Sequence, residues 1–332
     1  MDTAALKSSD MEISSFVEDL TRVQKALADS LRLQILRLLK NESFGVLELC
    51  RILDIRQSAL SHHLKVLSTA CLVSTRREGN SIFYRRAFLA DEDKFRDIKR
   101  STFDVVDNFP VPDKQAQKIK QIQLERAELS LSFFNRNSDK FKEQQGLIVE
   151  HRDYSASVHD IIDNLGMSNN ASVLEVGPGE GEFLVELAEK FKTLCALDNS
   201  KDMLKKSHDA AHAAQHNHVN FVLGDTGIAR NKNISADLII FNMVLHHISS
   251  PAKTFKDSSQ LLNESGYLLI IDLGSHDQDW VRESCGDLWL GFDNEDLDYW
   301  ANKAGLTMGQ SSYLGLRNGF QIQMRVFKKP AR

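Results

Sequence analysis

Residues 173–183 read Val-Leu-Glu-Val-Gly-Pro-Gly-Glu-Gly-Glu-Phe. The first four residues have the composition of a buried strand that carries an acid, and three alternating glycines follow before a segment typical of a helix. Glycines let the backbone turn sharply and approach a ligand closely. Open parallel sheets bind ligands at the carboxyl ends of their strands. We therefore expect a ligand site at this turn, and the flanking sequence indicates its kind.

The composition is that of an ordinary globular protein with more than one domain. The chain has 332 residues, 42% of them hydrophobic and 26% charged, and this length exceeds what one hydrophobic core normally holds. We find no signal-peptide pattern and no apolar run near the roughly 20 residues that span a bilayer. The four cysteines lie far apart with no CxxC pair, at positions 50, 71, 195 and 285, and are predicted to be reduced thiols. We expect a cytoplasmic protein with no membrane partner.

Downstream of the glycine turn, apolar strands alternate with helical segments. Strands are predicted at 194–198, 219–223, 237–242 and 266–272, which indicates a parallel, doubly wound α/β sheet. Two further strands, 306–314 and 319–327, flank Arg317-Asn318-Gly319 and predict an antiparallel terminal hairpin. A dinucleotide fingerprint is not met, because Glu182 stands where the third glycine of GxGxxG would be.

These segments, about 146–329, resemble the class I S-adenosylmethionine (SAM) methyltransferases, which have a Rossmann-like fold. The resemblance is strongest at 175–181, at 198–204 (Asp-Asn-Ser-Lys-Asp-Met-Leu) and at 242–247 (Asn-Met-Val-Leu-His-His). It implies SAM or S-adenosylhomocysteine (SAH) as the cofactor. The cofactor-binding residues that it implies are Glu175, Gly177, Gly179, Asp198, Asn199, Met203, Asp225, Thr226 and Asn242.

The resemblance also implies roles for most of these residues. Glu175 and the two glycines would line the methionine portion, Asp198 would bind the ribose, and Asp225 with Thr226 would meet the adenine. Met203 would cover the ring and Asn242 would close the floor of the pocket.

Three histidines are candidate catalytic residues: His246, His247 and His276. The first two follow the fourth strand and could instead only orient a loop. His276 with Asp272 could be a base or a neutral packing pair. A sulfonium is already an activated leaving group, so positioning the nucleophile at roughly 3–3.5 Å can supply much of the rate.

A further histidine series at 208, 212 and 216, with His218 beyond, shares one helix face. This spacing could bind zinc. No carboxylate or thiolate is expected beside it, however, and a solvated face is the better interpretation. We predict no metal site.

The segment before this α/β region is basic. Residues 21–90 contain twelve Lys/Arg against five Asp/Glu, a net charge of +7, so the remainder of this −5 chain carries −12. Such asymmetry suggests that only the front of the chain meets a polyanion. Helices are predicted from Asp29 or Ser30, over 45–53 and over 58–68, followed by a basic hairpin at 73–85.

Residues 20–90 resemble the ArsR/SmtB winged-helix repressors at Gln57 to Leu67, at Cys71-Leu72-Val73 and at Arg76 to Arg85. The resemblance implies a homodimer on a palindromic double-stranded operator, with flanking helices at about 11–28 and 91–106 forming the dimer contact. Gln and Ser can read base edges and Arg can neutralise phosphates. The predicted DNA-binding residues are Gln57, Ser58, Ser61, His62, Lys65, Arg76, Arg77 and Tyr84. Gly45-Val46-Leu47 stands where metal-sensing members carry a CxC box, so another signal must control DNA binding.

The predicted organisation is a winged-helix and dimerisation domain at 11–106, a helical connector at 107–150 and a methyltransferase-like domain at 151–330. In the connector, residues 124, 127, 131 and 134 form a predicted apolar stripe, and Phe133-Phe134 is interpreted as packing.

Two functions fit these domains. One is a transcription regulator, predicted as a repressor, whose SAM or SAH site is an effector sensor. The other is a methyltransferase for a small-molecule acceptor that regulates its own operon. A third hypothesis, methylation of a nucleic acid base, is disfavoured because no Asn/Asp-Pro-Pro-Tyr motif follows the fourth strand.

Overall fold

The computed structural model describes residues 3–137 and 141–331 and divides into two compact units, one up to Ile122 and one from Gln123 onward. Each unit has its own buried apolar core. The division falls inside the predicted connector, of which residues 138–140 lie outside the described part. Ile119 and Ile122 pack into the first core, so the connector is shared between the units and is not a third unit.

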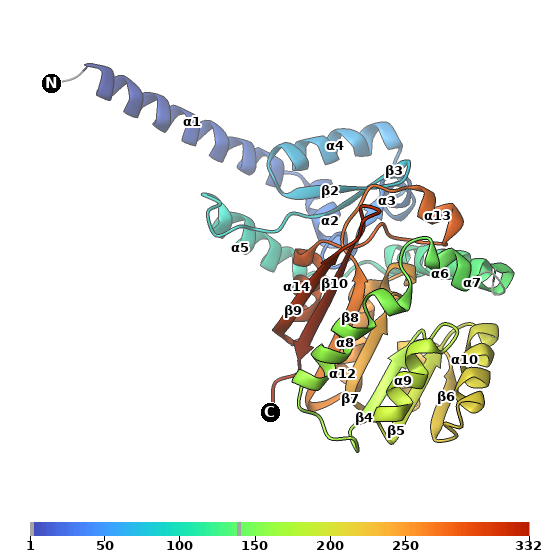
Figure 1. Ribbon diagram of the computed structural model, residues 1–332. Coiled ribbons are helices and arrows are strands. Elements are labelled where there is room, and N and C mark those ends of the chain that lie inside the picture. The colour runs from blue at the N-terminus through green and yellow to red at the C-terminus, as the bar shows by residue number, and fades with distance from the viewer. Residues whose placement is uncertain (1–2, 138–140, 332) are drawn as a thin grey trace. The chain divides into compact units, whose positions relative to one another are not determined.

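The first unit is a winged helix, as predicted (Figure 1). Its helices are α1 (Thr3–Leu27), α2 (Ser30–Leu38), α3 (Val46–Leu53), α4 (Gln57–Thr69), α5 (Arg96–Asp107) and the first part of α6 (Asp113–Asn137). Its strands are β1 (Phe44–Gly45), β2 (Val73–Glu78) and β3 (Ser81–Arg86), in the order β1-β3-β2. The two-residue β1, which the sequence did not indicate, pairs antiparallel with β3.

Local sequence explains where these elements begin and which face they bury. Asp29 caps α2, because its side chain accepts a hydrogen bond of 2.9 Å from the Arg32 amide, an interaction worth about 1 kcal/mol. On α4, Leu60, Leu64 and Leu67 are fully buried, as their spacing predicted. The polar residues between them therefore face outward.

The second unit is an α/β unit with helices on a seven-stranded sheet. Its strands are β4 (Ser172–Val176), β5 (Thr193–Asp198), β6 (Val219–Leu223), β7 (Ala236–Asn242), β8 (Leu262–Leu273), β9 (Thr307–Gly315) and β10 (Gln321–Lys328). Its helices, after the end of α6, are α7 (Phe141–Gly146), α8 (Ser155–Asn164), α9 (Glu182–Lys190), α10 (Lys201–Ala213), α11 (Thr226–Asn231), α12 (Pro251–Leu261), α13 (Trp280–Ser284) and α14 (Asn294–Lys303), with 3-10 turns at His151–Asp153 and Leu245–His247.

The order of the strands places a ligand site at the carboxyl ends of β4 and β7. The sheet runs β6-β5-β4-β7-β8-β10-β9, fanned across the unit in Figure 1. The first five of these strands are parallel, and β9 and β10 form the predicted antiparallel hairpin. The chain builds outward from β4 to β6 and then continues on the other side of β4 with β7. Such a reversal opens a crevice beyond the strand ends.

The apolar stripe predicted on α6 is wrong at Leu124, which is 47% exposed. The buried positions near it are Ile122, Arg126 and Ser130. Arg126 is buried because its guanidinium lies over the Trp289 ring, 4.9 Å from the centroid, which apolar periodicity cannot reveal. Among the described helices, none has the length and apolar character needed to cross a bilayer.

Candidate functional site

The glycine turn after β4 requires glycine at two positions at least. Gly177 and Gly181 have φ of +70° and +90°, a region that residues with a Cβ rarely adopt. A Cβ on Gly177 would lie 2.4 Å from Val244 Cγ2, and one on Gly181 would lie 2.9 Å from the Ser207 Cα. The turn therefore packs tightly against the loop after β7 and against α10.

Acids stand at the carboxyl ends of three neighbouring parallel strands. Glu175 lies near the end of β4, Asp198 ends β5, and Asp225 follows β6. Asp198 accepts a hydrogen bond of 2.7 Å from the Ser200 amide. Asp225 caps α11 by accepting one of 2.9 Å from the Ile228 amide.

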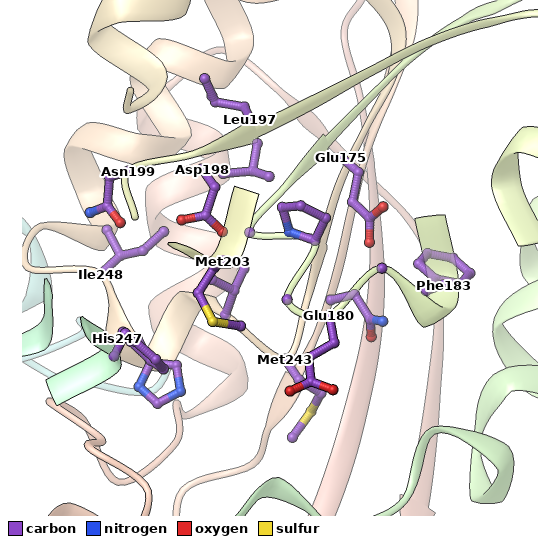
Figure 2. Close-up of a pocket in the computed structure, with 18 of the residues that line it drawn as sticks. Glu175, Glu180, Phe183, Leu197, Asp198, Asn199, Met203, Met243, His247 and Ile248 are labelled. Atoms are coloured by element: carbon purple, nitrogen blue, oxygen red, sulfur yellow. The ribbon is translucent and has the colours of Figure 1, made fainter. Parts of the chain in front are cut away.

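A cavity of about 610 Å³ lies over these strand ends, within the range of roughly 300–1,000 Å³ typical of ligand pockets. All nine predicted cofactor residues line it, and so does His247. Figure 2 shows Asp198, Asn199 and Ile248 on one side of this pocket and Glu175 with Phe183 on the other. The structure thus brings the nine predicted cofactor residues together, although they are up to 67 positions apart in the sequence.

Two acids of the cavity, the buried Glu175 and the half-buried Asp198, hold protons more tightly than usual. Burial, with the nearby Glu186 and Asp198 carboxylates, raises the pKa of Glu175 to about 8. Burial also raises the pKa of Asp198 to about 6, although backbone amides of Ser200 and Asn199 oppose the shift. Glu175 Oε2 is buried and has no hydrogen-bond partner among the described residues. A cationic or hydrogen-bond-donating ligand would satisfy this oxygen and lower the pKa of Glu175.

Two of the predicted residues are engaged by other side chains. The Tyr154 hydroxyl donates to Asn242 Oδ1 at 3.0 Å, so Asn242 is held with its oxygen toward Tyr154. The Thr226 hydroxyl donates to Asp257 Oδ2 at 3.1 Å. Thr226 therefore shapes the cavity wall with its methyl group and backbone, because its hydroxyl already donates a hydrogen bond to Asp257.

His246 and His247 belong to a buried charge network. His246 Nδ1 lies 2.8 Å from Asp272 Oδ1, and its Nε2 lies 3.9 Å from Asp287 Oδ1. Burial alone would lower the pKa of His246, but the carboxylates of Asp272 and Asp287 outweigh it and raise the pKa to about 9. Burial and the neighbouring His246 charge hold the pKa of His247 well below its usual value. The pair is thus one imidazolium beside one neutral imidazole.

His246, His247 and Asp287 also have potential ligand atoms within 4.8 Å of one another, the spacing of a metal group. His247 Nδ1, however, lies 3.3 Å from the Gly286 carbonyl oxygen. A carbonyl only accepts, so this nitrogen carries the hydrogen and has no lone pair for a metal. The Asp272 and Asp287 carboxylates beside His246 make this group a buried, proton-bearing network.

His276 is not part of this network. It lines neither of the cavities described here, and its ring packs against Phe320 with centroids 4.7 Å apart. The expectation that Asp272 partners His276 is wrong, because Asp272 binds His246. The histidines at 208 and 212 stack at 6.2 Å on α10, and His208 is exposed.

A second cavity, of about 260 Å³, adjoins the first. Both are lined by Gln145, His151, Tyr154, Glu182, Met243 and His247. The second cavity is lined in addition by His246, Cys285 and Asp287. The imidazole network therefore forms part of the wall between the two spaces.

In the first unit, the predicted DNA-binding residues of α4 share one exposed face. These residues are Gln57, Ser58, Ser61, His62 and Lys65. On the hairpin, Arg77 is exposed, whereas Arg76 is only 13% exposed and forms an ion pair of 2.5 Å with the buried Glu78. Tyr84 is partly buried and joins the core of the unit. Arg76 and Tyr84 thus have structural partners that the sequence pattern did not show.

Comparison with known families agrees with this geometry. Residues 102–309 match the model of a methyltransferase domain, which covers more than half of the chain. The chain belongs to this methyltransferase family. Residues 29–75 match the model of the bacterial regulatory proteins of the arsR family. The chain therefore joins an ArsR-type regulator domain to a methyltransferase domain.

Two similar proteins represent the two halves. The polyketide synthase-nonribosomal peptide synthetase pyiS of Pyricularia grisea is 30% identical over 135 residues, 37% of this chain and 3% of that protein. The transcriptional activator HlyU of Vibrio cholerae is 47% identical over 60 residues, 18% of this chain and 56% of that protein. This chain thus matches less than two thirds of the length of either relative.

One solved structure is similar to part of this chain. Magnesium protoporphyrin IX methyltransferase from Synechocystis, with bound SAM, has a TM-score of 0.44 and 16% identity. The match covers 54% of this chain and 79% of that one.

Sequence reasoning missed three residues of the site. Tyr154 and Asp287 lie outside any recognised motif, and the fold brings both to the small cavity that the histidine pair also lines. Phe134, interpreted as packing, lines the large cavity and also packs edge-on against His247 with centroids 4.8 Å apart. An aromatic residue on a helix before the first strand was the one signal available for this contact.

Proposed function

We propose that this protein is a DNA-binding transcription regulator whose methyltransferase unit binds SAM or SAH as an effector. The observation that carries the ligand proposal is Glu175, whose buried Oε2 has no hydrogen-bond partner in the described part of the chain and which lines the same cavity as Asp198. The ammonium of the methionine portion supplies the cation that Glu175 needs. The ribose hydroxyls supply donors for Asp198.

The other residues of the cavity would hold the rest of this ligand. Gly177 and Gly179 let the backbone approach the methionine portion, and Met203 would cover the adenine. Asp225 accepts from the Ile228 amide through Oδ1 and would meet the adenine amino group through Oδ2, and Thr226 would shape that end. The cavity volume of about 610 Å³ accommodates a ligand of this size.

The first unit would bind a palindromic operator as a homodimer. The exposed face of α4 would enter the major groove and the hairpin would flank it. Exposed apolar residues on the flanking helices support a dimer: Ile13, Phe16 and Val17 on α1, Val105 on α5 and Phe109 just after it. A SAM or SAH signal at the second unit would replace the metal signal for which the CxC box is missing. Repression is the proposed mode.

A second function, methyl transfer to a small molecule, is favoured by a different observation. The adjoining cavity of about 260 Å³ shares His247 and Tyr154 with the ligand cavity. An acceptor there would lie beside the methyl group of SAM, and positioning it in line would supply much of the rate. Methyl transfer and effector sensing are compatible, because each turnover would convert bound SAM to SAH at the site that signals to the DNA-binding unit.

Calorimetric titration with SAH tests the ligand proposal. We expect saturable one-site binding to the full-length protein and a loss of about ten-fold or more in affinity for Asp198→Ala, since a bond to a charged group is worth about 1.5–3 kcal/mol. The matched control is Asp202→Ala, an exposed acid on α10 that does not line the cavity. Absence of binding to the wild-type protein would sink the proposal. Transfer of radiolabelled methyl from SAM to a metabolite in a cell extract tests the second function.

A further inference from the structure

Two histidines share one carboxylate oxygen at the wall of the large cavity. Nε2 of His151 lies 3.0 Å from Glu186 Oε2, and Nε2 of His159 lies 2.7 Å from the same oxygen. Burial alone would raise the pKa of Glu186, but the hydrogen bonds from the two imidazoles outweigh it and lower the pKa. Glu186 is therefore ionised and only accepts, so both Nε2 atoms carry hydrogens.

His151 lines the cavity, whereas His159 does not. The His151 side chain is 9% exposed. Its ring packs against Tyr154 and Phe183, with centroids 5.3 and 5.5 Å apart. The other ring nitrogen, Nδ1, forms no hydrogen bond within the described part of the chain. Three neighbours thus hold the ring in place, and one nitrogen remains for a ligand.

His151 stands at the Glu175 end of the cavity. After burial, the Glu186 charge is the largest cause of the raised pKa of Glu175, so these two carboxylates are near neighbours. Figure 2 shows Phe183, which the His151 ring contacts, on the same side of the pocket as Glu175. In SAM and SAH the ammonium and the carboxylate are attached to one carbon. A ligand whose ammonium meets Glu175 therefore places its carboxylate at this end as well.

Lys253, which also lines the large cavity, stands at the other end. Its Nζ lies 2.7 Å from Asp257 Oδ2. A Cβ on Gly227 would lie 3.2 Å from Asp225 Oδ1 and 3.4 Å from Lys253 Nζ. The lysine is therefore paired, and it lies beside the residue proposed to meet the adenine.

The remaining basic side chains near the cavity do not supply a cation for this end. Burial and the charge of His246 hold the pKa of His247 well below its usual value, so that ring is neutral. Arg152 lines the small cavity and not the large one, and it forms an ion pair of 2.7 Å with Glu150. Among the described residues of the large cavity, His151 is the side chain left to meet an anion.

We propose that His151 binds the carboxylate of the methionine portion of SAM or SAH and makes the site selective for ligands that carry it. The proposal rests on the SAM or SAH site proposed above. As an imidazolium, His151 would donate its Nε2 hydrogen to Glu186 and its Nδ1 hydrogen to the ligand carboxylate, a charge-assisted bond. Without this donor, the ligand carboxylate would face the ionised Glu186 with no compensating charge.

The two charges of the ligand's amino acid end would then be recognised separately. Glu175 would meet the ammonium and His151 the carboxylate. An adenosine thioether that lacks the carboxylate would leave the His151 Nδ1 hydrogen without its acceptor, which is costly in a partly desolvated site. The unit would therefore respond to SAM and SAH and not to adenosine thioethers in general.

The test compares SAH with decarboxylated SAH, which keeps the adenosine portion and the ammonium and lacks only the carboxylate. Calorimetric titrations of the full-length protein at one near-neutral pH and fixed salt measure both affinities. We expect SAH to bind about ten-fold more tightly, as for one hydrogen bond between charged groups. Equal affinities of the wild-type protein for the two ligands would overturn the proposal.

A pair of variants assigns this preference to His151. His151→Phe keeps an aromatic ring beside Tyr154 and Phe183 but cannot donate, so SAH affinity should fall about ten-fold while the affinity for decarboxylated SAH stays within about two-fold. His159→Phe is the matched control, because it removes a hydrogen bond to the same Glu186 oxygen from a residue that lines neither cavity. It should keep the wild-type preference. The same loss of preference in both variants would overturn the assignment.

Two further variants close the remaining outcomes. Lys253→Met should keep the preference for SAH, and its loss there with an undiminished preference in His151→Phe would assign the carboxylate to Lys253 instead. If His151→Phe binds neither ligand, His151→Leu repeats the measurement with a smaller side chain. Loss of both ligands in both variants would overturn the selective role, because the ring would then support the whole site.

Wild-type binding of SAH separates the two levels of the argument. If SAH binds and its preference over decarboxylated SAH survives His151→Phe, the role of His151 is wrong and the ligand site stands. If SAH does not bind the wild-type protein, the proposed function and the role of His151 both fall.

Discussion

In the first unit the residues expected to meet DNA lie on an exposed helix face and a hairpin, whereas in the second unit the expected ligand residues line a cavity with buried carboxylates and tight glycines. Gln57, Ser61 and Lys65 are exposed, while Glu175 is 1% exposed. Residues of an exposed site can be substituted without loss of folding stability. A buried site is coupled to packing and to protonation, so its substitutions should show larger effects that depend on pH.

The largest effect is expected at the glycine turn. Gly177→Ala places a Cβ 2.4 Å from Val244 at a φ of +70°, and the left-handed conformation alone costs about 1–2 kcal/mol. We expect SAH affinity to fall by about 100-fold or more, measured by calorimetry. Gly315→Ala is the control, because nothing lies within 4 Å of a Cβ there. Normal SAH binding by Gly177→Ala would show that the buried site is less tightly packed than described.

Substitutions on the exposed face of α4 should weaken DNA recognition without lowering the stability of the protein. Gln57→Ala combined with Ser61→Ala should weaken binding to the DNA that this protein selects from a random-sequence pool. Each lost base contact should cost about 1–3 kcal/mol. Melting temperature and SAH affinity should not change, because both side chains face outward. A large drop in melting temperature would contradict the exposed placement; Ser68→Ala, on the same helix, serves as control.

The buried carboxylates predict pH-dependent ligand binding. The pKa of Glu175 is raised to about 8, so folded protein holds this proton at pH 7, while the unfolded chain loses it near 4.5. Stability from this group is therefore present below 4.5 and is lost as the pH rises through 8. SAH binds the ionised form, so its affinity should rise up to about ten-fold per pH unit below 8.

This pH dependence has a direct control. Glu175→Gln cannot ionise, and its SAH affinity should be lower and nearly flat between pH 6 and 8, apart from the contribution of Asp198 near 6. A wild-type profile as flat as that of the variant would show that Glu175 is not beside the ligand ammonium.

The smallest effect is expected from single charges on the hairpin. Arg77→Ala should reduce the salt dependence of DNA binding by about one phosphate contact. Arg76→Ala should act differently, because it removes the ion pair with buried Glu78 and should lower stability by about 1–3 kcal/mol. Equal effects of the two variants on both measurements would contradict the difference in burial. Fluorescence anisotropy over a salt series and chemical unfolding measure these two quantities.

The sequence predicted both folds because their signals are local. The spacing of Leu60, Leu64 and Leu67 predicts a helix face, and the apolar strand around Glu175 with its glycine turn predicts a parallel sheet. The nine residues predicted to bind the cofactor all line one cavity, because most of them stand at the end of a strand or in the turn after it. Asp287 was missed because its partner His246 is 41 residues away and no motif links them.

Charge counting was less reliable than motif reading. Arg86 contributed to the basic balance of the front segment, but it is buried and donates to Asp107 Oδ1 at 2.6 Å. His276 was paired with Asp272 on sequence proximity alone, whereas in the structure Asp272 forms a hydrogen bond with His246. Ion pairs between distant segments depend on tertiary structure, and a sequence pattern does not contain them.

The central claim is that ligand binding at the second unit changes DNA affinity at the first. The direct measurement is the affinity for the selected DNA at fixed salt, with no ligand, with saturating SAM and with saturating SAH. We predict a change of about five-fold or more for at least one ligand, and none for Gly177→Ala under the same conditions. Identical affinities in all three wild-type states, with SAH binding shown by calorimetry, would contradict the claim.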